Sequence, residues 1–344
     1  MEGAPDAIAA EEPLWSRSIR FALTVIAPIF LAFAYQGQQW APYALIASIA
    51  AFSTDTGGAP LPRLIWMASS ALTLIAGVAL GGLVGASPLW LCLAFAGAGV
   101  VYALTESGHQ IALTLARFFH IALALSALYM PPVPVDGLVI CAFCLLAWMI
   151  AIGWNALLGQ HVPSSAPRWH DFAQSLKARE LERVSFAIAV AVAVPAAYLA
   201  SSALSLDKPY WTMLAMVFVL RVDFLESRRL MAERFAGTVL GVVIAGALGV
   251  FFPHLSVLAP ALVIAALLRW PAQQRHGLLG VAALTAFVML ALELALVSTG
   301  HVLPLLEARI IDTGVGCAFA FAALVLEQYV RRAIVAGRKK FIDR

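Results

Sequence analysis

The stretch DKPYWTMLAMVFVLRVDFLESRRLMAERFAGT, residues 207–238, decides how the chain is interpreted. Between Trp211 and Arg221 it holds nine uninterrupted apolar or nearly apolar residues. A helix that crosses a bilayer needs about 20 apolar residues, and runs of roughly 10 to 14 are more often buried or re-entrant. This run is therefore too apolar for water and too short to cross a membrane comfortably.

Composition places the chain in a membrane. Of its 344 residues, 62% are hydrophobic and only 12% are charged, whereas soluble proteins carry about 25% charged residues. Long apolar runs favour helices over a barrel, so we predict an all-α polytopic membrane protein. The N-terminus lacks the cationic start and the small-residue cleavage site of a signal peptide, so the first apolar segment is expected to stay in the chain.

Apolar runs predict about twelve transmembrane helices, six on each side of a polar linker. The expected segments are 19–35, 40–52, 64–83, 88–104, 111–130, 137–158, 184–204, 210–220, 235–252, 257–268, 277–297 and 313–330. The predicted organisation is an N-terminal tail (1–18), a first six-helix repeat (19–158), a linker (159–183), a second six-helix repeat (184–330) and a basic tail (331–344).

Basic residues predict the orientation. With the N-terminus in the cytoplasm, all but three of the 22 Lys and Arg residues fall in cytoplasmic segments. The exceptions are Arg117, Lys208 and Arg309. Because cytoplasmic loops of membrane proteins are enriched in Lys and Arg, both termini, the linker and the basic tail are expected in the cytoplasm.

The two halves repeat. At a constant shift of 171, three residues of the first half match three of the second: Trp40, Asp55 and Arg63 against Trp211, Glu226 and Arg234. DGLVICAF (136–143) also matches DTGVGCAF (312–319). Six helices per half make the repeats parallel, related by a pseudo-two-fold axis along the membrane normal. Paired short segments, here 40–52 and 210–220, point to a transport site; the alternative is a pair of tilted packing helices.

Small residues recur every fourth position in the third predicted helix of each half. They are Ser69, Thr73, Gly77, Gly81 and Gly85 in the first half, and Gly237, Gly241, Ala245 and Gly249 in the second. This spacing lets helix backbones approach closely in lipid. We therefore predict that these two helices pack at the centre of the bundle.

Two polar residues interrupt the apolar segment 111–130. Arg117 lies about 10 Å from the cytoplasmic end of its helix, and an ionisable residue there marks either a pathway or an ion pair. Its guanidinium suits carboxylate recognition, because its planar fork matches both oxygens. His120 follows one turn later on the same face. It is a candidate proton carrier, or a polar group satisfied among aromatic residues.

Three more charged residues are candidates in the second half. Glu293 interrupts FVMLALELALV and is a candidate proton relay or a partner of Arg309. Arg309 and Asp312 can share a helix face. The alignment with Asp136 places Asp312 near the outer end of its helix, where it would either couple protons or merely cap the helix. Arg309 aligns with Val133, so the repeat does not require a base there.

Further candidates flank the short segments. Arg221, Asp223, Glu226, Arg228, Arg229 and Arg234 are predicted to form a cytoplasmic loop. This loop would either attract organic anions, with Arg221 contacting the substrate, or simply anchor the chain. The aromatic residues Trp40, Tyr210 and Trp211 are expected either at the membrane interface or stacked on an aromatic substrate.

These residues resemble the fusaric acid resistance protein-like family of bacterial inner-membrane transporters. The likeness rests on PYWT (209–212), the Arg221-x-Asp223 pair, ERFAGTVLG (233–241) and RIIDTGVGCAFA (309–320). It implies export of aromatic carboxylic acids and similar toxic compounds, often with a periplasmic adaptor protein. A more distant likeness is to plant aluminium-activated malate transporters, whose six-span units pair to form an anion path. Many family members carry a large cytoplasmic domain where this chain has only its linker.

The leading hypothesis is a proton-coupled exporter of aromatic carboxylates in the bacterial inner membrane; the alternative is a passive organic-anion channel of the malate-transporter type. A structural role in a larger pump stays open, as does a homo-oligomer. The sequence has no G-x-x-x-x-G-K-[ST] and no H-E-x-x-H. We therefore expect no enzyme activity, cofactor, metal site or nucleic-acid partner.

Overall fold

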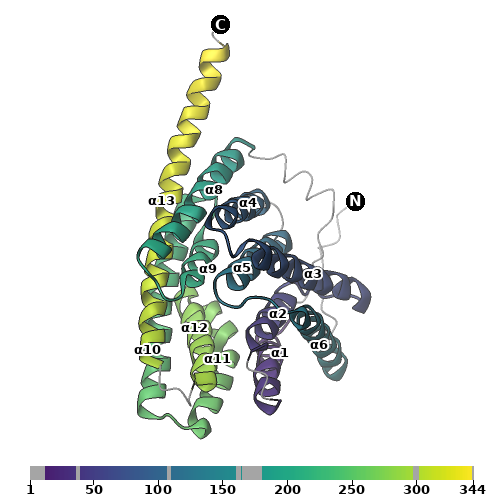
Figure 1. The fold of residues 1–344 in the computed structure, drawn as a ribbon. Coiled ribbons are helices and arrows are strands. Elements are labelled where there is room, and N and C mark those ends of the chain that lie inside the picture. The colour runs from purple at the N-terminus through teal and green to yellow at the C-terminus, as the bar shows by residue number, and fades with distance from the viewer. Residues whose placement is uncertain are drawn as a thin grey trace, which may run out of the picture.

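The computed structural model describes residues 12–35, 39–106, 110–159, 164, 180–296 and 302–342, and these form helices without any strand. The helices are α1 (Leu14–Ala34), α2 (Ala41–Ser53), α3 (Pro60–Val84), α4 (Pro88–Glu106), α5 (Gln110–Leu128), α6 (Pro134–Leu158), α8 (Glu180–Ala203), α9 (Pro209–Val219), α10 (Phe224–Phe251), α11 (Leu255–Arg275), α12 (Gly277–Leu296) and α13 (Val302–Ile342) (Figure 1). Ten of these are long and apolar enough to cross a membrane, and α2 and α9 are shorter. The predicted all-α polytopic class is confirmed.

Parts of the predicted organisation cannot be compared with the structure. Most of the N-terminal tail and of the linker lies outside the described residues. At the other end, α13 continues without a break through residues 331–342, so the predicted basic tail is an extension of the last helix.

The short helix α9 is fixed by local signals at both ends. Pro209 occupies its first position, and Leu220 leaves the helix in an extended conformation. Asp223 then caps α10, because its side chain accepts a hydrogen bond from the backbone nitrogen of Glu226 at 2.8 Å. The predicted cytoplasmic loop is therefore only four residues long, and the remaining members belong to α10: Glu226, Arg228, Arg229 and Arg234.

Two other helix boundaries differ from expectation. The segment predicted at 257–268 is part of the full-length helix α11, which continues through Arg269 and Pro271. Helix α13 begins at Val302, so Asp312 lies about 15 Å inside it, at 1.5 Å per residue. Asp136 does cap α6, since it accepts a hydrogen bond from the backbone nitrogen of Val133 at 2.8 Å. The expectation that Asp312 lies near a helix end and caps it is wrong.

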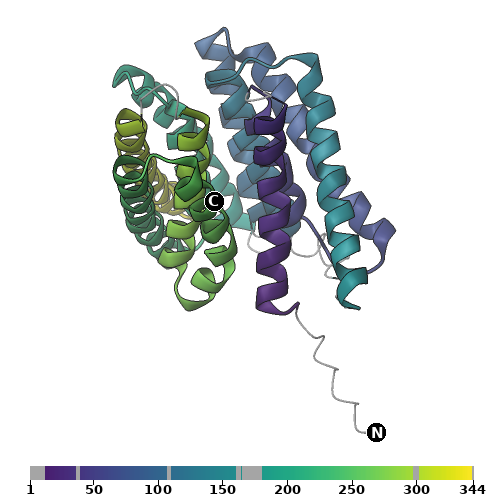
Figure 2. The ribbon, with the colours of Figure 1, turned by 90° about the horizontal axis from the view of Figure 1, so that it is seen from below.

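Helix packing follows the internal repeat. The fourth helix of each half packs on the first helix of the other half, so α4 contacts α8 and α11 contacts α1. Figure 2 shows the resulting pair of six-helix units side by side. The symmetry is broken at one place. Helix α5 contacts α9 between the halves, whereas the equivalent pair, α12 and α2, has no comparable contact.

The ladders of small residues serve contacts within each half. A Cβ on Gly77 would lie 2.6 Å from the carbonyl oxygen of Phe119, and one on Gly241 would lie 2.6 Å from that of Ala282. Helix α3 thus packs closely on α5, and α10 on α12. The prediction that α3 and α10 meet at the centre is wrong, because they lie at opposite flanks of the bundle (Figure 1).

We expect Gly241→Ala to lower the stability of the folded protein by about 1–3 kcal/mol, because the added methyl group overpacks the contact between α10 and α12. Gly97→Ala is the matched control, since a Cβ there has no neighbour within 4 Å. Thermal unfolding in detergent should show a lower Tm for Gly241→Ala only. Equal Tm values for the two variants would contradict the packing described for α10.

Candidate functional site

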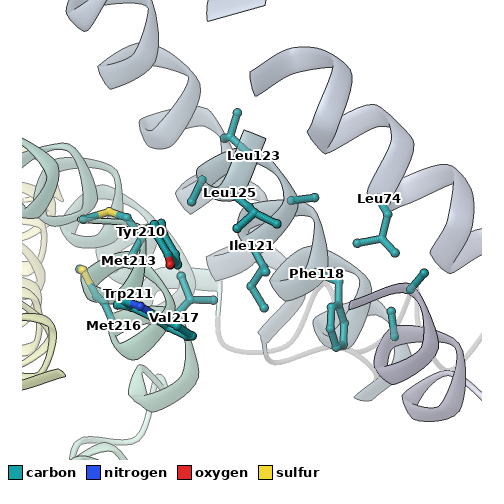
Figure 3. Close-up of a cluster of buried hydrophobic side chains, with 14 of the residues drawn as sticks. Leu74, Phe118, Ile121, Leu123, Leu125, Tyr210, Trp211, Met213, Met216 and Val217 are labelled. Carbon is teal, nitrogen blue, oxygen red and sulfur yellow. The ribbon is translucent and has the colours of Figure 1, made fainter. Parts of the chain in front are cut away.

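A cavity of about 740 Å³ lies between the two halves, within the range of small-molecule sites. Its walls come from α1, α2 and α5 of the first half and from α9, α10, α12 and α13 of the second. It occupies the space where α12 and α2 stand apart. Figure 3 shows the side chains of α5 and α9 that face each other beside it, including Ile121, Leu125, Tyr210 and Trp211.

Both short helices line the cavity, as their equivalent places in the repeat suggest. Helix α2 contributes an apolar wall of Ala41, Pro42, Leu45, Ile46 and Ile49. Helix α9 contributes Tyr210, Trp211, Leu214 and Phe218. The opposite wall is also mainly apolar and comes from α12, with Leu284, Thr285, Val288, Ala291 and Leu292. The cavity therefore offers an apolar surface to most of any ligand.

Charged side chains lie at separate places in the cavity wall. Asp207 and Lys208 line it beside the start of α9, and the Lys208 ammonium lies 4.9 Å from the centre of the Tyr129 ring. Arg309 lines it beside Trp211, and Arg234 lines it beside Phe218 near the end of α9. The two arginines are buried, with 3% of Arg309 and 8% of Arg234 exposed.

Arg309 is held by an aromatic ring rather than by a carboxylate. Its guanidinium carbon lies 3.7 Å from the centre of a Trp211 ring, a cation–π contact. Its Nε and Nη1 have no acceptor within the described part of the chain. Asp312 is one turn away, but no ion pair within 4 Å joins the two among these residues. Asp312 instead accepts a hydrogen bond from the Thr212 hydroxyl at 3.4 Å.

The repeat explains why Arg234 is unusual. Its counterpart Arg63 forms two hydrogen bonds to Asp55, from Nε at 2.7 Å and from Nη2 at 2.6 Å. Arg20 donates a third at 2.6 Å to the same carboxylate. This buried arrangement of Arg20, Asp55 and Arg63 is named the Asp55 triad below.

The second half lacks such a triad. Glu226, the counterpart of Asp55, lies 3.7 Å from Arg221 and its side chain is 57% exposed. Arg234 is left without an ion pair among the described residues, and its Nε has no acceptor there. Its guanidinium carbon lies 4.9 Å from the centre of the Phe218 ring. It is also close enough to Arg309 for the two positive charges to repel each other.

Two of the predicted site residues lie together at a different place. Tyr102 of α4 donates a hydrogen bond to the Leu220 carbonyl at 2.5 Å, and Arg221 donates one to the Tyr102 hydroxyl at 3.2 Å. Arg117 lies near this junction of the two halves, and its Nε and Nη2 have no acceptor within the described residues. Neither Arg117 nor Arg221 lines the cavity.

The remaining predicted residues also lie away from the cavity wall. His120 is buried and stacks on Phe95, with ring centres 5.6 Å apart. Trp40 packs on Phe143 at 5.7 Å. Glu293 is buried against α10, where a Cβ on Gly249 would lie 2.6 Å from its Oε2. Its carboxylate oxygens have no partner in the part of the chain described, so the alternative of an ion pair with Arg309 is not seen there.

Of the nine predicted site residues, the cavity wall therefore contains Tyr210, Trp211 and Arg309. Asp312 lies behind it, on the same helix as Arg309. Arg234 is a buried, charged lining residue that the sequence interpretation missed, because it was assigned to a loop. The internal repeat held the signal that could have found it, since it equates Arg234 with Arg63 but replaces Asp55 with Glu226.

Comparison with known proteins shows which family part of this chain resembles. The model of the fusaric acid resistance protein-like family matches residues 196–323, which contain α9, Arg234, Arg309 and Asp312. "Uncharacterized protein ORF2" of Neisseria gonorrhoeae is 27% identical over 138 residues. The match covers 40% of this chain and 32% of that relative, so the chain spans about a third of the relative's length. No solved structure matches. The predicted resemblance to the fusaric acid resistance protein-like family is confirmed over residues 196–323.

Proposed function

We propose that the protein is a membrane transporter whose substrate is an organic anion bound in the cavity between its two halves. The observation that carries this proposal is the pair of buried guanidinium groups, Arg234 and Arg309, that face an apolar cavity without an acidic partner among the described residues. Burying an unpaired charge costs several kcal/mol. An anionic ligand would offset that cost, and the apolar walls would bury its carbon skeleton.

An aromatic carboxylate fits this cavity chemically. Its ring would lie against Phe118, Trp211 or Phe218, and its carboxylate would accept hydrogen bonds from the fork of an arginine. The family resemblance supports the same substrate class. It also supports efflux across a bacterial inner membrane with a separate periplasmic adaptor. These finer statements are part of the proposal.

Proton coupling is proposed for two buried carboxyl groups. Glu293 faces α10 without a partner in the described residues, and Asp312 lies one turn from Arg309. A buried carboxyl group within a membrane helix is costly when charged and is a common proton carrier. A proton on Asp312 would change the electric field at Arg309, which would link protonation to the affinity for an anion.

The experiment is uptake of radiolabelled hydroxybenzoate into inverted membrane vesicles. Arg309→Gln and Arg234→Gln are each expected to reduce uptake at least about 30-fold, the effect of losing a buried charge-assisted contact of 2 kcal/mol or more. Arg229→Gln is the matched control, because this arginine lies on α10 but its side chain is 75% exposed. Full uptake by both cavity variants would exclude the cavity as the anion site.

The same assay tests coupling. An uncoupler is expected to stop uptake by the unchanged protein, and uptake by Glu293→Gln or Asp312→Asn should no longer respond to the proton gradient. Glu226→Gln, with an exposed side chain, is the control. Uptake that ignores the uncoupler in the unchanged protein, together with a measurable anion current, would instead support the passive channel.

A further inference from the structure

The face of α9 that lines the cavity has a regular pattern. Trp211, Leu214 and Phe218 all contribute to the wall. Residues three, four and seven positions apart lie on one face of a helix, so these side chains form a single row. Seven residues correspond to about 10 Å along the helix axis. The row therefore has an aromatic ring at each end and an aliphatic side chain between them.

Each of the two aromatic rings in this row contacts one guanidinium group. The guanidinium carbon of Arg309 lies 3.7 Å from the centre of the Trp211 ring, and that of Arg234 lies 4.9 Å from the centre of the Phe218 ring. Because both rings belong to one helix, the two positive charges lie beside opposite ends of the same row of side chains. Leu214 lies between them, and Leu284, Val288 and Leu292 of α12 provide further apolar wall.

No acid of the described residues neutralises these charges from within the cavity. Asp312 is turned to Thr212 and is not part of the wall, and Glu293 faces Gly249 of α10. Asp207 is exposed and lines the cavity beside the start of α9, next to Lys208. A ligand with one negative charge would therefore pair with one arginine and leave the other buried, unpaired and repelled by its neighbour.

We propose that the preferred ligand of this cavity is an organic dianion whose two carboxylate-like groups are joined by an apolar spacer. The proposal rests on the proposed function, because it specifies the anion that the cavity transports. One carboxylate pairs with Arg309 beside Trp211, and the other pairs with Arg234 beside Phe218. The spacer lies along Leu214 and the apolar wall of α12.

The test compares two series of ligands on the purified full chain, by isothermal titration calorimetry. The first series consists of α,ω-dicarboxylates of increasing length: succinate, adipate, suberate, sebacate and tetradecanedioate. The second consists of monocarboxylates, octanoate and decanoate. We expect the best-fitting dicarboxylate of the series to bind at least about 30-fold more tightly than either monocarboxylate. Affinity should pass through a maximum along the series, because a dicarboxylate that is too short cannot reach both arginines and one that is too long cannot lie extended between them.

Variants of the two arginines test whether the preference for dicarboxylates comes from these residues. Arg234→Gln and Arg309→Gln should each remove the advantage of the best-fitting dicarboxylate, so that it binds no more tightly than a monocarboxylate. Arg229→Gln, on the exposed face of α10, should preserve the whole series. A single anion that steps from one arginine to the other would give no advantage to dicarboxylates and no dependence on length. That outcome would overturn the inference while leaving organic-anion transport intact. Failure of both series to bind would reject the proposed function as well.

Discussion

Replacing Asp55 with alanine is expected to lower the free energy of unfolding by about 3–5 kcal/mol. The Asp55 triad contains two buried guanidinium groups, and the Asp55 carboxylate accepts hydrogen bonds from both at 2.6–2.7 Å. Without the carboxylate, Arg63 loses its hydrogen bonds to Asp55, and among the described residues Arg20 keeps an ion pair with Glu12 alone. Most of the cost is therefore the burial of positive charge that is no longer compensated.

Glu226→Ala is the matched control, because this position is the counterpart of Asp55 in the repeat. Its ion pair with Arg221 is longer, at 3.7 Å, and exposed, so its loss should cost less than about 1 kcal/mol. In thermal unfolding in detergent, Asp55→Ala should lower the Tm by roughly 10 °C and Glu226→Ala by far less. Similar Tm values for the two variants would show that the Asp55 triad does not stabilise the fold.

Low pH should weaken the stabilisation that the Asp55 triad provides. Burial alone would raise the pKa of Asp55, but the hydrogen bond from Arg63 and the charges of Arg20 and Arg63 outweigh it and hold this pKa below its usual range. A depressed pKa contributes stability that is fully present above the pKa of the unfolded chain and is lost as the pH falls through the folded pKa. The Tm difference between the unchanged protein and Asp55→Ala should thus be constant near neutral pH and shrink only in strong acid.

Arg234→Met is expected to have the opposite effect on stability and a large effect on function. Arg234 is buried beside Phe218 and has no ion pair among the described residues, so methionine removes an uncompensated charge but keeps much of the packing volume. We expect the protein to become more stable by about 1–3 kcal/mol. Anion uptake should fall at least about 30-fold, because half of the cationic pair is lost.

Arg63→Met provides the internal comparison, since the repeat equates Arg63 with Arg234. Removing Arg63 leaves the Asp55 carboxylate with one cation fewer, so this variant should unfold at a lower temperature than the unchanged protein. The same substitution at equivalent positions should therefore shift the Tm in opposite directions. A lower Tm for Arg234→Met would contradict the assignment of Arg234 as a residue that favours binding over stability.

The helical architecture could be predicted from the sequence because apolar length and periodicity report directly on membrane helices. The short helices α2 and α9 were also identified, since their brevity is visible in the apolar runs. The helix ends that depend on capping residues were harder to predict. Asp223 begins α10 inside a charged stretch that resembles a loop, and α13 begins eleven residues before the expected Thr313.

The candidate site was predicted only in part for a similar reason. Trp211 and Arg309 could be singled out individually, as an aromatic residue on a short helix and a base in an apolar segment. Their contact, however, joins α9 to α13 across almost a hundred residues of sequence. Among the described residues, Arg234 faces the cavity unpaired because Glu226, the counterpart of Asp55, lies beside Arg221 instead. Asp55 pairs with Arg63 and Arg20, and in the sequence only the comparison of the two repeats, in which Glu226 replaces Asp55, signals that Arg234 lacks such a partner.

The difference between Arg63 and Arg234 has a consequence for how such a molecule can be assembled. A two-fold pair of identical subunits presents the same residue in the same surroundings twice. Both arginines would then be locked in an ion pair, or both would be free. Joining the two six-helix units in one polypeptide removes this constraint. Arg63 can then stabilise the fold through its ion pair, while Arg234 keeps its charge available to a ligand. Covalent linkage of the halves thus permits a division of labour that a homodimer of either half could not achieve.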